Sequence, residues 1–346
     1  MIPNQFFPHL QVDGTFPVVK ILDVTLRDGS FAVDFKWTED GIKVIARALA
    51  KAAIPFIELG YYGGVPEPPY IQDKGITGNV PLHLAQELAL EHPSTNFALM
   101  MHPDLIQQVI DFQRIKQSGL ALVRFVYHPA WANPFKQLLR AAQDAGLQTS
   151  INLSMSSRYD LETLLQLCAE LSQLSPSVIY LADTCSAFYP HQVRSLFTRL
   201  ATTIDTPLGF HAHDFLSLAF ANSLAAASAG ATYIDASLLG IGRGAGNLRS
   251  EIWCISSIAQ QKDVFFVEHL LPAIRHIQQY TLNSEQDILS IVLGACNLTP
   301  PEEQLLRDVA LKAGDDAASL LACRYVSNRL TQSHLTEDGL RELLWS

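Results

Sequence analysis

Two histidines one residue apart, His211 and His213, end a short apolar run, and that spacing places both imidazoles on the same face of a strand. A helix-like stretch, residues 217–230, follows them, so the pair should lie at the mouth of a βα unit. Far upstream, Asp28 ends another apolar run. Two imidazoles and one carboxylate are a frequent ligand set for a divalent metal. Buried structural histidines are the alternative, and spacing alone leaves both interpretations open.

The elements that must position these groups follow a regular rhythm, in which short apolar, β-rich runs alternate with amphipathic stretches. We predict strands at Val19–Val24, Phe56–Leu59, Phe97–Met101, Leu122–Val126, Gln148–Leu153, Val178–Leu181, Leu208–Phe210 and Tyr233–Ser237, with a helix after each, the third at Asp104–Ser118. Eight βα units in roughly 245 residues predict an α/β fold of the (β/α)₈ TIM barrel type. A doubly wound sheet is less favoured, because no glycine-rich phosphate turn follows the first strand.

The barrel is expected to span residues 15–265, and residues 266–346 to form a helical C-terminal extension. Helical patterns at 305–312, 317–330 and 335–345 are amphipathic, so the extension should pack on something. A lid over the barrel or an interface between subunits is the expectation, and a simple cap on the barrel is the alternative. The interface interpretation predicts a homo-oligomer.

Composition excludes several classes of protein. The 346 residues carry a net charge of −10 with no Lys/Arg-rich run, which argues against nucleic-acid binding. No apolar stretch is long enough to span a membrane, and the first residues lack the pattern of a secretory signal. Five scattered cysteines, without CxxC spacing, are typical of reduced thiols. We therefore expect a cytoplasmic location.

The predicted strands end in polar groups, as a barrel enzyme with its active site at that end requires. The candidates for substrate binding are Thr25, Glu58, Asp183 and Thr184. Glu58, Arg124 and Asp235 are equally well explained as internal ion pairs that hold the strands in register.

Four segments together resemble the DRE-TIM metallolyase superfamily, which includes hydroxymethylglutaryl-CoA lyase, isopropylmalate and homocitrate synthases, and 4-hydroxy-2-oxovalerate aldolase. They are Leu-Asp-Val-Thr-Leu-Arg-Asp-Gly at 22–29, His-Ala-His-Asp at 211–214, Ala-Asn-Ser-Leu-Ala-Ala at 221–226 and Gly-Ile-Gly-Arg-Gly-Ala-Gly-Asn at 240–247. Their order and separations fit the superfamily. The last segment is most similar to the aldolase branch, since the synthases usually have Gly-Glu-Arg there.

This resemblance implies a divalent metal held by Asp28, His211 and His213, with Asn247 approaching it, and a catalytic Arg27 that steadies an enolate. Such a metal acts as a Lewis acid on an α-keto acid. A fixed donor beside the developing charge is typically worth on the order of 10²–10³ in rate. The ligand types fit Mn²⁺ or Mg²⁺ first, and Zn²⁺ as well.

The sequence departs from the aldolase branch at its general base. Those aldolases have a histidine two residues after the Arg-Asp-Gly glycine, where this chain has Phe31. The reactive cysteine of the lyase is also absent, because Gly244 and Ala245 occupy its region. Proton transfer must therefore fall to another group near the barrel mouth or to metal-bound water. The candidates are His128, Tyr62, Tyr61 and His102, and the first two are the catalytic residues we predict with Arg27. His128 comes first because the aldolases also have a histidine at the fourth strand.

Three functions remain open at this point. The first is a metal-dependent aldolase, a carbon–carbon lyase acting on pyruvate or another α-keto acid with an aldehyde partner. An aldehyde dehydrogenase would then be a candidate partner protein. The second is a Claisen-type synthase that joins acetyl-CoA to an α-keto acid. The third is a metal-binding paralogue that has lost catalysis and now serves as a binding partner or scaffold. The aldolase is favoured, because the tail has no room for a regulatory domain and a scaffold needs no catalytic arginine.

Overall fold

The computed structural model of the protein describes residues 16–65, 73–106, 108–259, 262, 265–280, 298–313, 321 and 336–345. Eight parallel strands close into a barrel in chain order, with β8 pairing to β1. The strands are β1 (Lys20–Asp23), β2 (Phe56–Tyr61), β3 (Asn96–Met101), β4 (Leu122–Tyr127), β5 (Gln148–Leu153), β6 (Val178–Asp183), β7 (Leu208–Ala212) and β8 (Ala231–Ala236). This closure confirms the predicted (β/α)₈ barrel.

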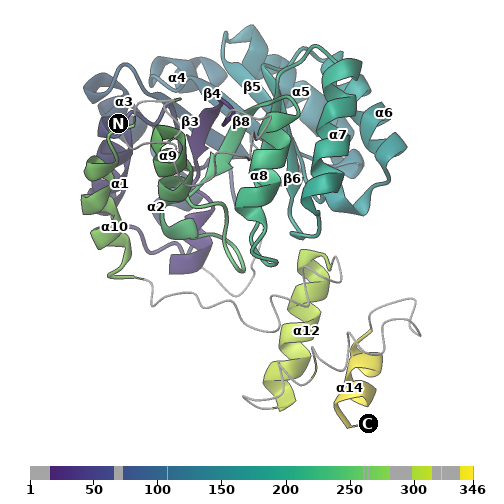
Figure 1. Cartoon of the computed structure of the whole chain (residues 1–346). Coiled ribbons are helices and arrows are strands. Elements are labelled where there is room, and N and C mark those ends of the chain that lie inside the picture. The colour runs from purple at the N-terminus through teal and green to yellow at the C-terminus, as the bar shows by residue number, and fades with distance from the viewer. Residues whose placement is uncertain are drawn as a thin grey trace, which may run out of the picture.

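Helices alternate with these strands and surround the barrel (Figure 1). They are α1 (Glu39–Lys51), α2 (Gly75–Gly78), α3 (Leu82–Glu91), α4 (Phe112–Gln117), α5 (Ala132–Asp144), α6 (Leu161–Ser172), α7 (Pro190–Thr203), α8 (Ala219–Ser228), α9 (Ser250–Ala259) and α10 (Leu271–Ile277). Short 3₁₀ turns are η1 (Gly29–Val33), η2 (Pro129–Trp131), η3 (Ser156–Arg158), η4 (Leu238–Gly240) and η5 (Val267–Leu270). No described helix is long and apolar enough to cross a bilayer.

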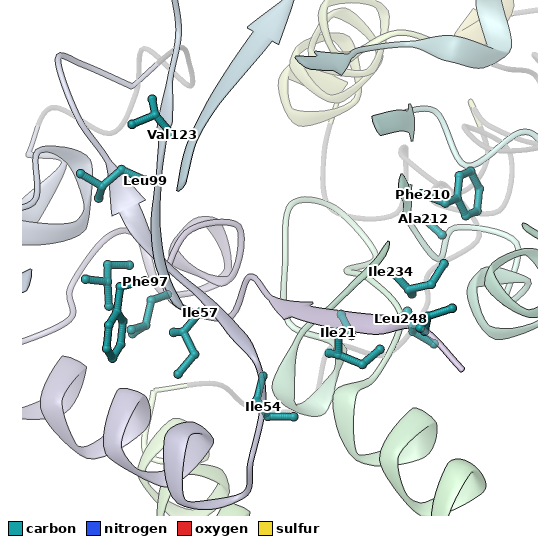
Figure 2. Packing of buried hydrophobic residues seen from close by; sticks show 14 of the residues in the cluster. Ile21, Ile54, Ile57, Phe97, Leu99, Val123, Phe210, Ala212, Ile234 and Leu248 are labelled. Atoms are coloured by element: carbon teal, nitrogen blue, oxygen red, sulfur yellow. The ribbon is translucent and has the colours of Figure 1, made fainter. Parts of the chain in front are cut away.

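The period-2 alternation of the strands divides their side chains between two environments. Outward residues such as Ile21, Ile57 and Phe210 pack between barrel and helices (Figure 2). Inward residues at the base of the barrel, such as Leu22 and Phe56, form a second apolar cluster. Further along the same strands, the inward positions become polar: Glu58, Arg124, Asn152, His211 and Asp235, all buried. The alternation therefore directs a set of polar side chains into the upper part of the barrel.

The segment after β3 differs from the sequence prediction. A helix was expected from Asp104 to Ser118, but α4 begins only at Phe112. The side chain of Asp111 accepts a hydrogen bond from the backbone nitrogen of Arg114 at 3.0 Å, which makes it the N-cap and fixes the start of the helix there. Residues 103–105 form a turn directly after β3, and His102, Asp104 and Leu105 line the cavity described below.

The chain continues along the barrel after α9. Residues of η5 and α10 pack on α1, where Phe266 donates its backbone N–H to Ala52 and Tyr280 lies against Trp37. Beyond them, α12 (Pro300–Ala313) and α14 (Glu337–Trp345) pack against each other and lie past one end of the barrel (Figure 1). The expected helix at 317–330 lies outside the described residues, Leu321 excepted.

Candidate active site

A cavity of about 590 Å³ lies at the carboxyl ends of the strands. Its walls come from residues at or after the ends of all eight strands, and from the first turns of α12. Helix α12 therefore contributes to the same cavity as the barrel. An ion pair fixes this contact, because Arg243 in the loop after β8 donates to Glu303 of α12 at 2.7 Å.

His211 lies in β7 and His213 directly follows that strand. Their imidazole rings point toward each other in this cavity. Their Nε2 atoms are 3.4 Å apart. The Nδ1 atom of His211 lies 3.0 Å from the carboxylate of Asp235, and that of His213 lies 3.2 Å from the backbone oxygen of Gly246. Because both Nδ1 atoms face acceptors, they carry the ring protons, and two Nε2 lone pairs face each other. Such a pair is repulsive unless a cation lies beside it.

Asp28 completes this group. Its carboxylate and the two imidazoles offer ligand atoms that all lie within 4.8 Å of one another, and all three residues are buried. The side-chain nitrogen of Asn247 donates to Asp28 Oδ2 at 2.7 Å, while Asn247 Oδ1 is buried without a partner. Outer partners that orient each ligand are typical of metal sites in proteins. The residues present therefore fit a divalent metal with nitrogen and oxygen ligands.

The glycine-rich loop after β8 allows this close packing. A Cβ added at Gly242 would lie 2.2 Å from Asn247 Nδ2 and 2.6 Å from Asp28 Oδ2. Asn247 pairs with His213 across a short bridge, which carries the asparagine back to the metal-binding group. Glycine at 242 is thus required for Asn247 to reach Asp28.

A buried chain of ion pairs connects this group to the barrel interior. Arg27 donates to Asp28 Oδ1 at 2.6 Å and from Nε to Glu58 Oε2 at 2.7 Å. Glu58 also accepts from Arg124 at 3.1 Å, and Arg124 donates to Asp235 at 2.6 Å. Since Asp235 in turn contacts His211, one network runs from Arg27 to the imidazole of His211. It fixes both the guanidinium and the imidazole.

The charges in this network set the protonation of its members. Burial disfavours the charge of Arg27, but the carboxylates of Glu58 and Asp28 outweigh it and raise the pKa of the guanidinium. Burial opposes the charge of Asp28 as well, yet Arg27 beside it holds the pKa of that carboxyl well below its usual range. Burial lowers the pKa of His213 to about 3. The site thus presents a fixed cation at Arg27, a carboxylate at Asp28 and a neutral imidazole at His213.

Comparisons with known proteins agree with this geometry. The HMGL-like family profile matches residues 127–269. A 4-hydroxy-2-oxovalerate aldolase from Geobacillus genomosp. 3 is 31% identical over 234 residues, which cover 68% of this chain and 68% of that protein. The chain belongs to the HMGL-like family. A second 4-hydroxy-2-oxovalerate aldolase, from Geobacillus stearothermophilus, is 29% identical over 306 residues, 88% of this chain and 89% of that protein.

The structural comparison gives the same fold. The HMG-CoA lyase of Bacillus subtilis superposes with a TM-score of 0.63 at 22% identity, covering 76% of this chain and 93% of that one. Membership of the HMGL-like family confirms the resemblance to DRE-TIM metallolyases.

Two of the four expected substrate-binding residues of this HMGL-like protein, Thr25 and Asp183, accept hydrogen bonds from backbone nitrogens. Thr25 Oγ1 accepts from Leu238 N at 2.8 Å, which ties the β1 loop to η4. Asp183 accepts from the backbone nitrogens of Ala187 and Phe188 at 2.9 and 3.1 Å, and so shapes the loop after β6.

Of the other two expected substrate-binding residues, Thr184 lines the cavity and Glu58 does not. Glu58 has no exposed surface and lies behind Arg27. The Thr184 hydroxyl accepts from the backbone nitrogen of Met155 at 2.9 Å, so the side chain is fixed in position.

Two of the four proton-transfer candidates line the cavity and two do not. His128 and Tyr62 are not among the described residues that line the cavity, whereas Tyr61 and His102 are. His128 Nδ1 instead accepts from Ala130 N at 3.2 Å and so caps the η2 turn. Phe31, at the position where the aldolase branch has its histidine, lines the cavity and packs edge-on against Tyr61.

Several cavity residues were not predicted from the sequence. Asp104 and Trp131 flank His102, and Glu303 and Arg307 arrive from α12. The His-Pro-Asp order at 102–104, directly after a strand, could have indicated the first of these contacts. No local signal indicated that α12 reaches the barrel mouth.

Proposed function

We propose that this protein is a divalent-metal-dependent aldolase that breaks or makes the C3–C4 bond of a 4-hydroxy-2-oxo acid, with a pyruvate-type keto acid and an aldehyde as the other partners. The observation that carries this proposal is the convergence of Asp28, His211 and His213, with the Arg27 guanidinium 2.6 Å from the Asp28 carboxylate. The names of the two Geobacillus relatives support the same reaction.

The metal would be held by Asp28, His211 and His213, with Asn247 beside them. When bound, it supplies Lewis-acid stabilisation of the negative charge that develops on the keto-acid oxygens. Mn²⁺ and Mg²⁺ are the metals we propose first, and Zn²⁺ suits the same ligands.

Arg27 supplies the second cation of the site. Its contacts to Glu58 and Asp28 fix the guanidinium before substrate arrives, so that it stabilises an enolate with little reorganisation. Glu58 serves this reaction by holding Arg27, and Thr25 and Asp183 by holding the loops around the site. Thr184 is the residue of this set placed to contact substrate, because it lines the cavity.

Release of pyruvate from 4-hydroxy-2-oxovalerate tests the proposal. The protein should release pyruvate with Mn²⁺ present, and EDTA should stop the reaction. The synthase alternative predicts instead that free CoA thiol appears from acetyl-CoA and an α-keto acid. If neither product forms with any of the three metals, the aldolase proposal is wrong and the non-catalytic paralogue is favoured.

We also propose a cytoplasmic location, self-association through the C-terminal helices, and hand-over of the aldehyde to an aldehyde dehydrogenase. The amphipathic pattern of the C-terminal helices supports the self-association, because an apolar helix face must pack on something. Light scattering of the purified protein tests the self-association, and a monomer would contradict it.

A further inference from the structure

Cleavage of a 4-hydroxy-2-oxo acid needs a group that takes the proton of the C4 hydroxyl. The residue at position 31 cannot do this, because it is Phe31. The proton must therefore go to another side chain of the cavity, an inference that rests on the proposed aldolase function.

Most charged groups in the cavity are committed elsewhere. The cavity also contains four arginines, and a guanidinium group offers hydrogen-bond donors but no acceptor for a proton: Arg27, Arg124, Arg243 and Arg307. Asp28, His211 and His213 form the metal-binding group. Asp235 is paired with Arg124, and Glu303 lies between Arg243 and Arg307 at 2.7 and 2.9 Å. The carboxylates of Asp235 and Glu303 are thus each engaged by arginine side chains.

The tyrosines of the cavity are poor acids and bases near neutral pH. Burial raises the pKa of Tyr61 to about 12, and burial raises the pKa of Tyr180 well above its usual value. His102 is the remaining titratable side chain of the described lining, apart from the Asp104 carboxylate that contacts it.

His102 follows β3 directly and continues the inward alternation of Ala98 and Met100. Its Nδ1 contacts the Asp104 carboxylate, and its ring packs on Trp131 with centroids 4.5 Å apart. The residue is 7% exposed and lines the cavity. A carboxylate at Nδ1 keeps the proton on that nitrogen and leaves a lone pair at Nε2, the arrangement that makes an imidazole an effective base.

We propose that His102 is the proton-transfer residue of this enzyme and that Asp104 is its positioning residue. In the cleavage direction His102 Nε2 takes the proton of the C4 hydroxyl. The electron pair of the C3–C4 bond becomes the C2–C3 double bond of the enolate, and C4–O becomes the aldehyde carbonyl. The imidazolium then returns the proton to C3, the C2 carbonyl re-forms, and His102 is neutral again. No further reactant is required.

Pyruvate release from 4-hydroxy-2-oxovalerate by His102→Gln tests the assignment. We expect kcat to fall about 100-fold or more, the usual contribution of general acid–base catalysis. Mn²⁺ affinity should stay unchanged, and added imidazole should restore part of the activity of His102→Ala. His83→Gln, a substitution on the exposed face of α3, controls for loss of a histidine as such.

The His128→Gln variant tests the competing assignment, because His128 packs on the same Trp131 ring with centroids 5.3 Å apart. A large loss in that variant, with His102→Gln unaffected, would overturn the proposal. Wild-type activity retained by His102→Gln would do the same while leaving the aldolase function intact. If the wild-type protein releases no pyruvate with any metal, the proposed function itself fails, and this assignment with it.

The Asp104→Asn variant tests the positioning role separately. Burial lowers the pKa of His102, and the Asp104 carboxylate opposes that effect. Within the part of the chain that the structure describes, the ring contacts this carboxylate and the uncharged Trp131. Removing the carboxylate should therefore move the acid limb of the kcat profile to lower pH and reduce kcat. An acid limb that stays in place would contradict the role of Asp104.

Discussion

The side-chain amide of Asn247 and the carboxylate of Asp28, 219 positions apart in the chain, meet in a hydrogen bond of 2.7 Å inside the barrel mouth. Arg27 holds the other oxygen of that carboxylate at 2.6 Å. Asp28 is therefore held from both sides in its orientation toward His211 and His213. The metal-binding group is pre-organised by contacts from the β1 loop and the β8 loop.

Asn247→Ala should weaken metal binding. Loss of a group that orients a ligand typically costs about 10–100-fold in metal affinity. Isothermal titration with Mn²⁺ measures this directly. The control is Asn222→Ala, which removes another buried amide, one that donates to Phe188 O at 2.7 Å outside the metal-binding group. An equal effect of both substitutions on affinity would contradict the specific role of Asn247.

Gly242→Ala should disrupt the same group by steric conflict. The added Cβ would approach Asn247 Nδ2 to 2.2 Å and Asp28 Oδ2 to 2.6 Å, so the hydrogen bond between them must break. We expect Mn²⁺ affinity to fall at least as far as in Asn247→Ala. Gly146→Ala serves as control, because a Cβ there meets nothing within 4 Å, and its left-handed backbone costs about 1 kcal/mol of stability alone. Unchanged affinity in Gly242→Ala would refute the packing argument.

Glu58→Gln should destabilise the fold. Glu58 lies between Arg27 and Arg124 without exposed surface, so the neutral amide leaves two buried cations short of a counter-charge. Breaking a buried pair in this way typically costs about 3–5 kcal/mol, measured here by urea unfolding. The matched exposed pair is Arg199 with Glu162, also 2.7 Å apart, where Glu162→Gln should cost about 1 kcal/mol or less. Equal costs for the two variants would argue against the buried network.

The buried carboxyl of Asp23 should make stability depend on pH. Burial raises its pKa to about 6 from 3.8, against the hydrogen bonds from Ser250 and Thr25. The folded protein therefore binds the proton more tightly than the unfolded chain, and stability falls as pH rises from about 4 to about 6. Relative to Asp23→Asn, which lacks this titration, the unfolding free energy should drop by about 3 kcal/mol between pH 4 and pH 7. A difference that is constant over this range would contradict the raised pKa.

The strand pattern and the shared face of His211 and His213 could be predicted because both depend on short-range rules. Alternation with period 2 places His211 and His213 on one face, and eight βα units of ordinary length close one barrel. The same rule would have favoured His102, which continues the inward alternation of β3.

The alternation rule does not extend to His128. This residue directly follows β4, and its side chain caps the η2 turn instead. The position of α12 could not be predicted either. Contacts such as Arg243 with Glu303 join segments 60 residues apart, and an amphipathic pattern shows that a helix packs without showing where.

Exchange of the pyruvate methyl protons in ²H₂O, followed by NMR, tests the central claim that Asp28, His211, His213 and Arg27 form an enolate-stabilising metal site. The account predicts exchange with Mn²⁺ or Mg²⁺ that EDTA stops and that Arg27→Ala slows by about 10²–10³-fold. Exchange that persists in EDTA, or that is unaffected in Arg27→Ala, would contradict it.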